Sequence, residues 1–212
     1  MVKYLFIIAA LITTSVIVHA NEGFYVDGTA GANFLDSSDK DVKIDFDTGY
    51  LVSGSLGYKF SNGLRVEGEI GYRRNNLNQI KIPLIREEYI INSEEGVKLI
   101  SSNTIREKFN VHGHLETISF LGHLLYELQL TECINPYIGA GAGYALQSIY
   151  VKHIEGIPVK VHGHQNGFAW DLLGGVVYSI CENIDLDLQY RYFRSQGNQT
   201  DNTIAAGIKY FF

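Results

Sequence analysis

The sequence predicts an all-β protein, an eight-stranded antiparallel up-and-down transmembrane β-barrel that follows a cleaved signal peptide. Three observations predict this fold. Apolar and polar residues alternate along eight segments of 10 to 14 residues. The composition of 22 Gly, 14 Tyr and 11 Phe with only 3 Pro favours strands over helices. The connections between segments are alternately short and long, as in barrels that cross a membrane.

Residues 1–20 are expected to be a signal peptide. Lys3 provides the positive charge, an apolar run covers Tyr4 to Val18, and Ala20 ends a cleavage site, so the mature chain would begin near Asn21. An uncleaved anchor helix is the alternative. Residues 21–212 then form one domain. The formal net charge is −6, or −7 once Lys3 is removed (−6 − 1), which argues against a nucleic-acid partner.

The eight strands are expected at 24–34, 48–60, 64–74, 115–128, 137–149, 167–180, 184–194 and 203–212. In 184–194, IDLDLQYRYFR, one face is wholly apolar and the other carries the charged side chains. Strands of soluble sheets average about 5–6 residues, whereas a tilted membrane strand needs about 9–11. These lengths therefore favour a barrel that is apolar outside and polar inside.

The connections predict which rim faces which compartment. Short turns, such as SNG at 61–63, are expected on one rim, and long loops at about 35–47, 75–114, 150–166 and 195–202 on the other. Outer-membrane barrels place the short turns in the periplasm. The predicted location is therefore the cell outer membrane, with outer-membrane lipid around the barrel and the long loops exposed at the cell surface.

Aromatic residues on the outward positions are expected to form two girdles at the membrane interfaces. They are Phe24, Tyr58, Phe60, Tyr126, Tyr178, Tyr210 and Phe212 near the periplasmic rim, and Phe34, Tyr50, Tyr72, Trp170 and Tyr192 near the other.

The inward positions carry acids and bases: Asp27, Lys59, Arg65, Glu67, Glu69, Arg73, His123, Glu127, Asp171, Asp185, Asp187, Arg191 and Lys209. An eight-stranded barrel is only wide enough for its own side chains. These charges are therefore expected to pair across the lumen, where Gly139, Gly141 and Gly143 leave room for larger groups, and to plug it.

The long segment 75–114 could add two more membrane strands. Pro83 cannot donate to a ladder, and Arg86, Glu88 and Glu107 would fall on lipid-facing positions, where a charge is costly. We therefore expect a hairpin that stands above the membrane. Its apolar residues Tyr89, Ile90 and Ile91 are the candidate binding patch for a host-cell surface protein.

Two VHGH segments, 111–114 and 161–164, each place two histidines on one side of an extended chain, a spacing that can chelate Zn²⁺ or Cu²⁺. Ordinary rim histidines have the same pattern, and no acid or cysteine is evidently placed beside them. No metal ion and no cofactor are therefore assigned.

Cys133 and Cys181 fall in short turns on the periplasmic rim, where the oxidising compartment makes a disulfide plausible. A free pair is the equal alternative.

Some eight-stranded barrels modify lipids with Ser, His and an acid. Here Ser119 and His123 lie four residues apart, about 13 Å along a strand, and Glu116 is on the other face. A nucleophile and its base would not touch, so no catalytic residue is assigned and an enzyme is not expected.

The stretches NPYIGAGAGYA (135–145) and GFAWDLLGGVVYSICENIDLDLQYRYF (167–193) and the ending GIKYFF resemble the opacity-like surface antigens of rickettsial-type bacteria. The chain is also similar to the membrane domain of the OmpA group in its strand number. The resemblance implies a surface antigen or adhesin without catalysis. A structural protein or a narrow porin-like channel is the alternative, and a lipid-modifying barrel enzyme the third.

Overall fold

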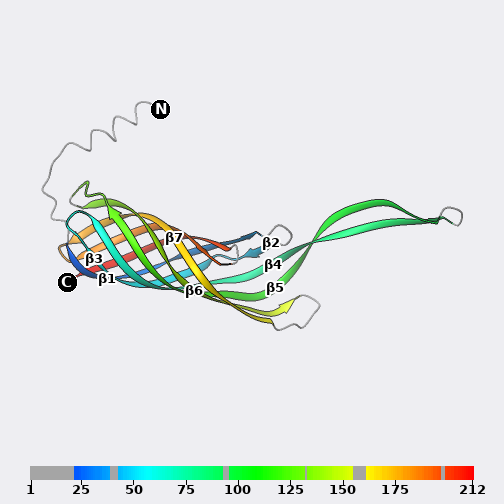
Figure 1. Cartoon of the computed structure of the whole chain (residues 1–212), viewed down its shortest axis with the longest axis horizontal. Helices are drawn as coiled ribbons and strands as arrows, with labels where there is room; N and C mark the ends of the chain where they lie inside the picture. The colour runs from blue at the N-terminus through cyan, green and yellow to red at the C-terminus, as the bar shows by residue number, and fades with distance from the viewer. Residues whose placement is uncertain (1–21, 39–42, 93–95, 132, 155–160, 197–198) are drawn as a thin grey trace, which may run out of the picture.

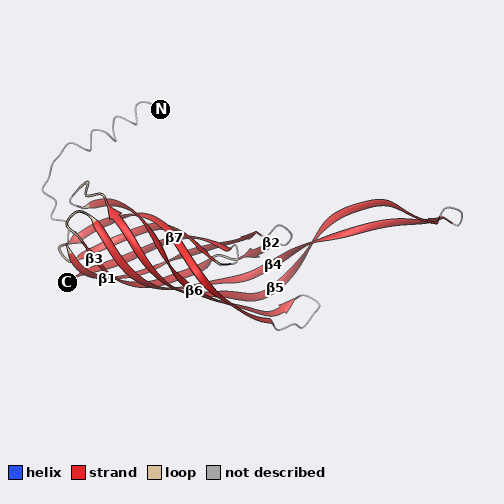
Figure 2. Ribbon diagram, viewed as in Figure 1, coloured by secondary structure: helices blue, strands red, loops and turns tan. Residues whose placement is uncertain are grey.

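The computed structural model describes residues 22–38, 43–92, 96–131, 133–154, 161–196 and 199–212. The expected signal peptide at 1–20 lies outside these residues. All nine elements are strands (Figure 2), in the sheet order β2-β1-β3-β4-β5-β6-β7-β8-β9, and β1 also pairs with β9. Because the first and last long strands are paired, the sheet closes on itself and leaves no edge within the wall of the barrel. No helix in the described ranges is long and apolar enough to cross a bilayer.

The strands run as follows: β1 Gly23–Ser38, β2 Lys43–Phe46, β3 Gly49–Lys59, β4 Leu64–Asn92, β5 Gly96–Glu127, β6 Ile134–Ile154, β7 Val161–Cys181, β8 Ile184–Ser195 and β9 Gln199–Phe211. All neighbours are antiparallel. Eight of them, all but β2, cover the predicted membrane segments to within one residue at each end, so the predicted eight-stranded antiparallel barrel is confirmed. β2 is an addition that the sequence analysis missed. It lies in the predicted loop at 35–47 and pairs with both β1 and β4.

Three turns join the strands at one end of the barrel, here the short-turn rim. In the β3–β4 turn Gly63 has a φ of +83°, a conformation that favours glycine, and its N–H donates to the carbonyl of Phe60. The end of the chain is paired at the same rim. The N–H of Phe211 donates to Asn183, and that of Phe212 to the carbonyl of Phe24.

Side chains alternate between a buried lumen face and an exposed outer face. β8 is buried at every second position from Asp185 to Ser195 and is exposed or intermediate between them, with Leu188 and Tyr190 exposed and Asp187 and Gln189 buried. The polar side chains are thus inside and the apolar ones outside, the inverse of a water-soluble protein. Every residue of the inward-facing charged set is buried except Asp27, which is half-buried.

At the opposite end, here the long-loop rim, β4 and β5 extend far beyond their neighbours (Figure 1). Their ladder continues to Asn92↔Gly96. β2 stops pairing with β4 at Lys81, and β6 pairs with β5 only from Val111 onward. The long connection at 75–114 thus contains a two-stranded hairpin, as expected, and the hairpin projects from the barrel.

Candidate functional site

Ion pairs lie inside the lumen near the short-turn rim. Glu127 on β5 accepts hydrogen bonds from Lys59 at 2.7 Å and from Arg65 at 3.2 Å. The Arg65 guanidinium also lies over the ring of Tyr137, 4.6 Å from its centroid. All three charged side chains are at most 2 % exposed, so each cation needs the carboxylate that it contacts.

The next layer links acids to tyrosines and a lysine. Lys209 contacts Asp187 directly and lies 3.7 Å from Asp27. The Tyr137 hydroxyl donates to Asp187 at 2.7 Å. On the other side of the lumen the Tyr25 hydroxyl donates to Glu67. The lumen is closed here by hydrogen-bonded side chains.

The middle of the barrel holds a bidentate pair between Arg191 and Glu69 and a contact of 3.1 Å between His123 and Asp171. Ser119 takes no part in the contact between His123 and Asp171 and accepts a hydrogen bond from Arg73. Glu116, the third group weighed for catalysis, is on the outer wall and pairs with Arg74. Ser119, His123 and Glu116 therefore take separate partners and do not assemble into a catalytic group.

Arg73 differs from the other lumen arginines. Its Nη1 donates to Ser119 at 2.8 Å, and its guanidinium lies 3.9 Å from the centroid of the Phe193 ring. Its Nε and Nη2 have no hydrogen-bond partner within the residues that the structure describes. Arg73 is thus a buried cation held by an aromatic face and a hydroxyl.

At the long-loop rim a network of Asn and Thr side chains with one acid, Asp201, takes the place of the ion pairs. The side-chain amide of Asn33 donates to Asn75 at 2.7 Å and to Asp201 at 3.1 Å, and Thr203 donates to Asn33. All four side chains are buried inside the barrel. The alternation of side chains predicts inward positions for these residues, but it carries no signal for which of them meet.

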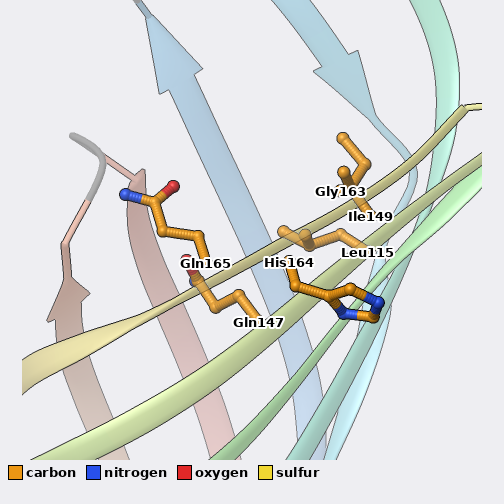
Figure 3. A pocket seen from close by; sticks show the side chains of 6 residues that line it. All are labelled: Leu115, Gln147, Ile149, Gly163, His164 and Gln165. Atoms are coloured by element: carbon orange, nitrogen blue, oxygen red, sulfur yellow. The ribbon is translucent and has the colours of Figure 1, made fainter.

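A pocket of about 210 Å³ lies at the mouth, lined by Leu115, Gln147, Ile149, Gly163, His164 and Gln165. Gln147, one of the lining residues, donates to Ser195 at 2.8 Å. In Figure 3 the side chains of Gln165 and His164 leave β7 on opposite sides. His164 therefore belongs mainly to the outer wall.

The histidines of the two VHGH segments meet on that outer wall. His114 stacks on Tyr150 with ring centroids 4.9 Å apart, and His162 meets the other side of Tyr150 at 5.1 Å. His164 Nδ1 is 3.0 Å from the Ser148 hydroxyl. Among the described residues no group of three or more His, Cys, Asp or Glu side chains could hold a metal ion. The side chain of His112 lies outside the described part.

Cys133 and Cys181, for which a disulfide and a free pair were equal alternatives, are both free and exposed in the structure. The Cys133 carbonyl accepts a hydrogen bond from the N–H of Ser179, so Cys133 lies opposite Ser179 rather than opposite Cys181. Cys181 is two residues beyond Ser179 and is therefore the diagonal neighbour of Cys133 on the adjacent strand. Diagonal neighbours have Cα atoms about 7–8 Å apart, which exceeds the separation that a disulfide spans.

The candidate binding residues lie near the tip of the hairpin. In its ladder Tyr89 pairs with Leu99, Ile90 with Lys98 and Ile91 with Val97, directly after an irregularity in register at Glu88 and Tyr89. The side chains of Tyr89, Ile90 and Ile91 lie outside what the structure describes, so their role as a binding patch stays a prediction.

Residues 5–212 match the family described as "Outer membrane protein beta-barrel domain". The chain belongs to this family. It therefore lies in the outer membrane, and lipid contacts its outward face. The family is one of membrane barrels and is not an enzyme family.

Individual proteins agree with this assignment. The chain is 25 % identical over 185 residues to an outer membrane protein of Gluconacetobacter diazotrophicus, covering 82 % of this chain and 43 % of that one. It is 27 % identical over 89 residues to the outer membrane protein PagN of Salmonella typhimurium, covering 41 % and 37 %. The match thus spans less than half the length of either relative. The crystal structure of Neisserial surface protein A (NspA) shares the fold, with a TM-score of 0.55, 22 % identity and coverage of 90 % and 97 %.

Proposed function

We propose that the chain is a surface protein that contacts a host-cell surface protein through the β4–β5 hairpin. The observation that carries this proposal is the ladder that continues from Ile82↔Glu107 to Asn92↔Gly96, above the last pairings with β2 and β6. The wall of the barrel closes below this segment, because β1 to β9 already pair there. The hairpin is therefore available for contact.

The backbone of the hairpin suggests how it would bind. In the described ranges no strand pairs with the outer edge of β4 beyond Lys81, or of β5 between Gly96 and Asn110. Unpaired edges accept an extended segment of another protein by main-chain hydrogen bonds. A two-stranded ribbon is only marginally stable in water, so a third strand would stabilise it. The β5 edge is the better one, because Pro83 removes a donor from β4.

The resemblance of 135–145 and 167–193 to opacity-like surface antigens supports a surface role, although these stretches lie in the barrel wall. We keep Tyr89, Ile90 and Ile91 as the proposed side-chain anchors beside the strand edge. A narrow channel is the alternative, and the buried ion pairs inside the lumen argue against it.

Replacing residues 82–107 by Asn-Gly tests the proposal, since it joins the paired residues Lys81 and Lys108 by a tight turn. Bacteria that express this variant should lose adhesion to host cells, while the barrel keeps its heat-modifiable gel migration. A control deletion of residues 155–160, which connect β6 to β7 in the sequence, should leave adhesion unchanged. Full adhesion without the hairpin would refute the proposal.

Proline variants test contact through the β5 edge. Neighbouring residues of a strand point their N–H groups to opposite sides. Two variants are therefore compared, Thr104→Pro and Ile105→Pro. One of them removes an N–H that donates to β4, and the other removes an N–H on the free edge of β5. The variant that removes the free-edge N–H should keep the hairpin and lose adhesion. If both variants keep the hairpin and adhere normally, the partner does not use this edge.

A further inference from the structure

The outer wall changes from apolar to polar at one level on three neighbouring strands. The outward residues of each strand show this in order towards the long-loop rim. On β5, Phe120 and Ile118 are followed by Glu116, and on β6, Tyr144 and Leu146 are followed by Ser148. On β7, Phe168 is followed by Asn166 and His164. The strand register places the boundary residues of the three strands side by side, since Ile118 pairs with Leu146 and Leu146 pairs with Asn166. A lipid-facing barrel makes this change where the acyl chains end and the head groups begin.

A hollow of about 360 Å³ lies on this boundary, here the outer-wall hollow. Its apolar side is formed by Ile118 and Leu146, which are both exposed and continue into the lipid-facing wall. Its polar side is formed by Glu116, Ser148, His164 and Asn166. The volume is within the range of small-molecule sites, about 300–1,000 Å³. The hollow therefore fits an amphiphile, with its apolar part towards the membrane.

Contacts on the wall hold the polar side in place. Glu116 is 3.4 Å from Arg74 on β4 and 3.6 Å from His114 on its own strand. Ser148 and His164 are in hydrogen-bond contact at 3.0 Å. The groups are thus oriented before a ligand arrives, which reduces the entropy cost of binding.

We propose that the outer-wall hollow binds the sugar head group of a glycolipid in the membrane leaflet at the long-loop rim. Sugar hydroxyls donate to a carboxylate such as Glu116 and accept from the amide of Asn166. A bare phosphate fits less well, because the lining residues include a carboxylate and no Lys or Arg in the described part of the chain. Because the apolar side is continuous with the lipid-facing wall, the occupant is a membrane lipid and not a soluble sugar.

The experiment places the full mature chain in phosphatidylcholine nanodiscs that contain a minor fraction of one added lipid. Digalactosyl diacylglycerol supplies a sugar without phosphate, phosphatidylglycerol supplies a phosphate without a sugar, and free galactose supplies the sugar without a lipid. Native mass spectrometry counts the retained lipid, and NMR follows the amide signals of Ser148 and Asn166. The variants are Asn166→Leu and Ser148→Ala, and the control is Asn202→Leu at the same boundary on β9.

The wild type should retain digalactosyl diacylglycerol and shift both amide signals. Asn166→Leu should weaken this retention roughly tenfold, as expected for one lost hydrogen bond, and Asn202→Leu should leave it unchanged. Ser148→Ala provides the same comparison if Asn166→Leu fails to fold. Equal or better retention of phosphatidylglycerol, equal shifts with free galactose, or equal loss in the control would each overturn the proposal. So would a wild type that retains no glycolipid.

Discussion

Arg191 on β8 and Glu69 on β4, 122 residues apart in the sequence, are joined by two hydrogen bonds of 2.5 and 2.7 Å across the lumen. Both side chains are at most 4 % exposed. Two planar groups that meet in this way fix the distance between opposite walls. The pair also fills the centre of the barrel with charge, in place of the apolar core of a soluble protein.

Breaking this pair should destabilise the barrel. Arg191→Met leaves the Glu69 carboxylate buried without its main partner, and we expect a loss of about 3–5 kcal/mol in the free energy of unfolding. The double variant Arg191→Met/Glu69→Leu removes both charges and should recover most of the loss. Urea unfolding in lipid vesicles measures both values. A single variant as stable as the wild type would contradict the role given to the pair.

Arg73 should respond in the opposite way. It has no ion pair within the described residues, and two of its nitrogens lack hydrogen bonds, so its charge is buried with little compensation. Arg73→Met keeps most of the contact with Phe193 and removes that cost. We expect unchanged stability or a gain of about 1–4 kcal/mol. A loss as large as that of Arg191→Met, in the same urea assay, would mean that Arg73 has a partner in solution.

The inward glycines of β6 should tolerate no added methyl group. A Cβ at Gly141 would overlap His123 and Asp171, and one at Gly139 would overlap Leu125. Gly141→Ala should therefore cost about 1–3 kcal/mol. Gly68→Ala is the matched control, because a Cβ there meets nothing within 4 Å, and it should change stability by less than about 0.5 kcal/mol. Equal effects of the two changes would refute the assignment of inner and outer faces.

The two cysteines should react as free thiols. We expect a maleimide reagent to label both Cys133 and Cys181 in native, unreduced protein, because both are exposed and lie on a strand diagonal too long for a disulfide. The mass after labelling should be the same with and without prior reduction. Labelling that requires a reductant would show that the two thiols are bonded.

The sequence was sufficient for the wall of the barrel, because a period of two decides which side of a strand meets lipid. Leu188 and Gln189 are adjacent and lie on opposite faces as the pattern predicts. Pairings in the lumen could not be predicted, because Arg65, Arg73 and Arg191 are alike in sequence and differ only in the side chains that each one meets inside the barrel. The roles of Glu127, Phe193 and Glu69 as their partners depend on register, which no local pattern fixes.

The hairpin above the barrel was predicted, but not that β4 and β5 would run into it as continuous strands. Pro83 and the charges near it indicate correctly that β4 and β5 do not continue as membrane strands, but those residues do not prevent a strand in water, and the ladder runs through them. β2 was missed because four residues, Lys43–Phe46, are too few to show a period. Its pairing with β1 and β4 depends on tertiary contacts.

Trp170 gives the most direct test that lipid surrounds this barrel. It is the single tryptophan, and its ring is 5.7 Å from Tyr192 on the outer wall, beside the exposed Phe168 and Leu172. In vesicles of brominated lipids its fluorescence should be quenched, and more strongly by bromine near the head groups than by bromine at the chain ends. No quenching by either lipid, together with a mature chain that stays monomeric in water without detergent, would contradict the account.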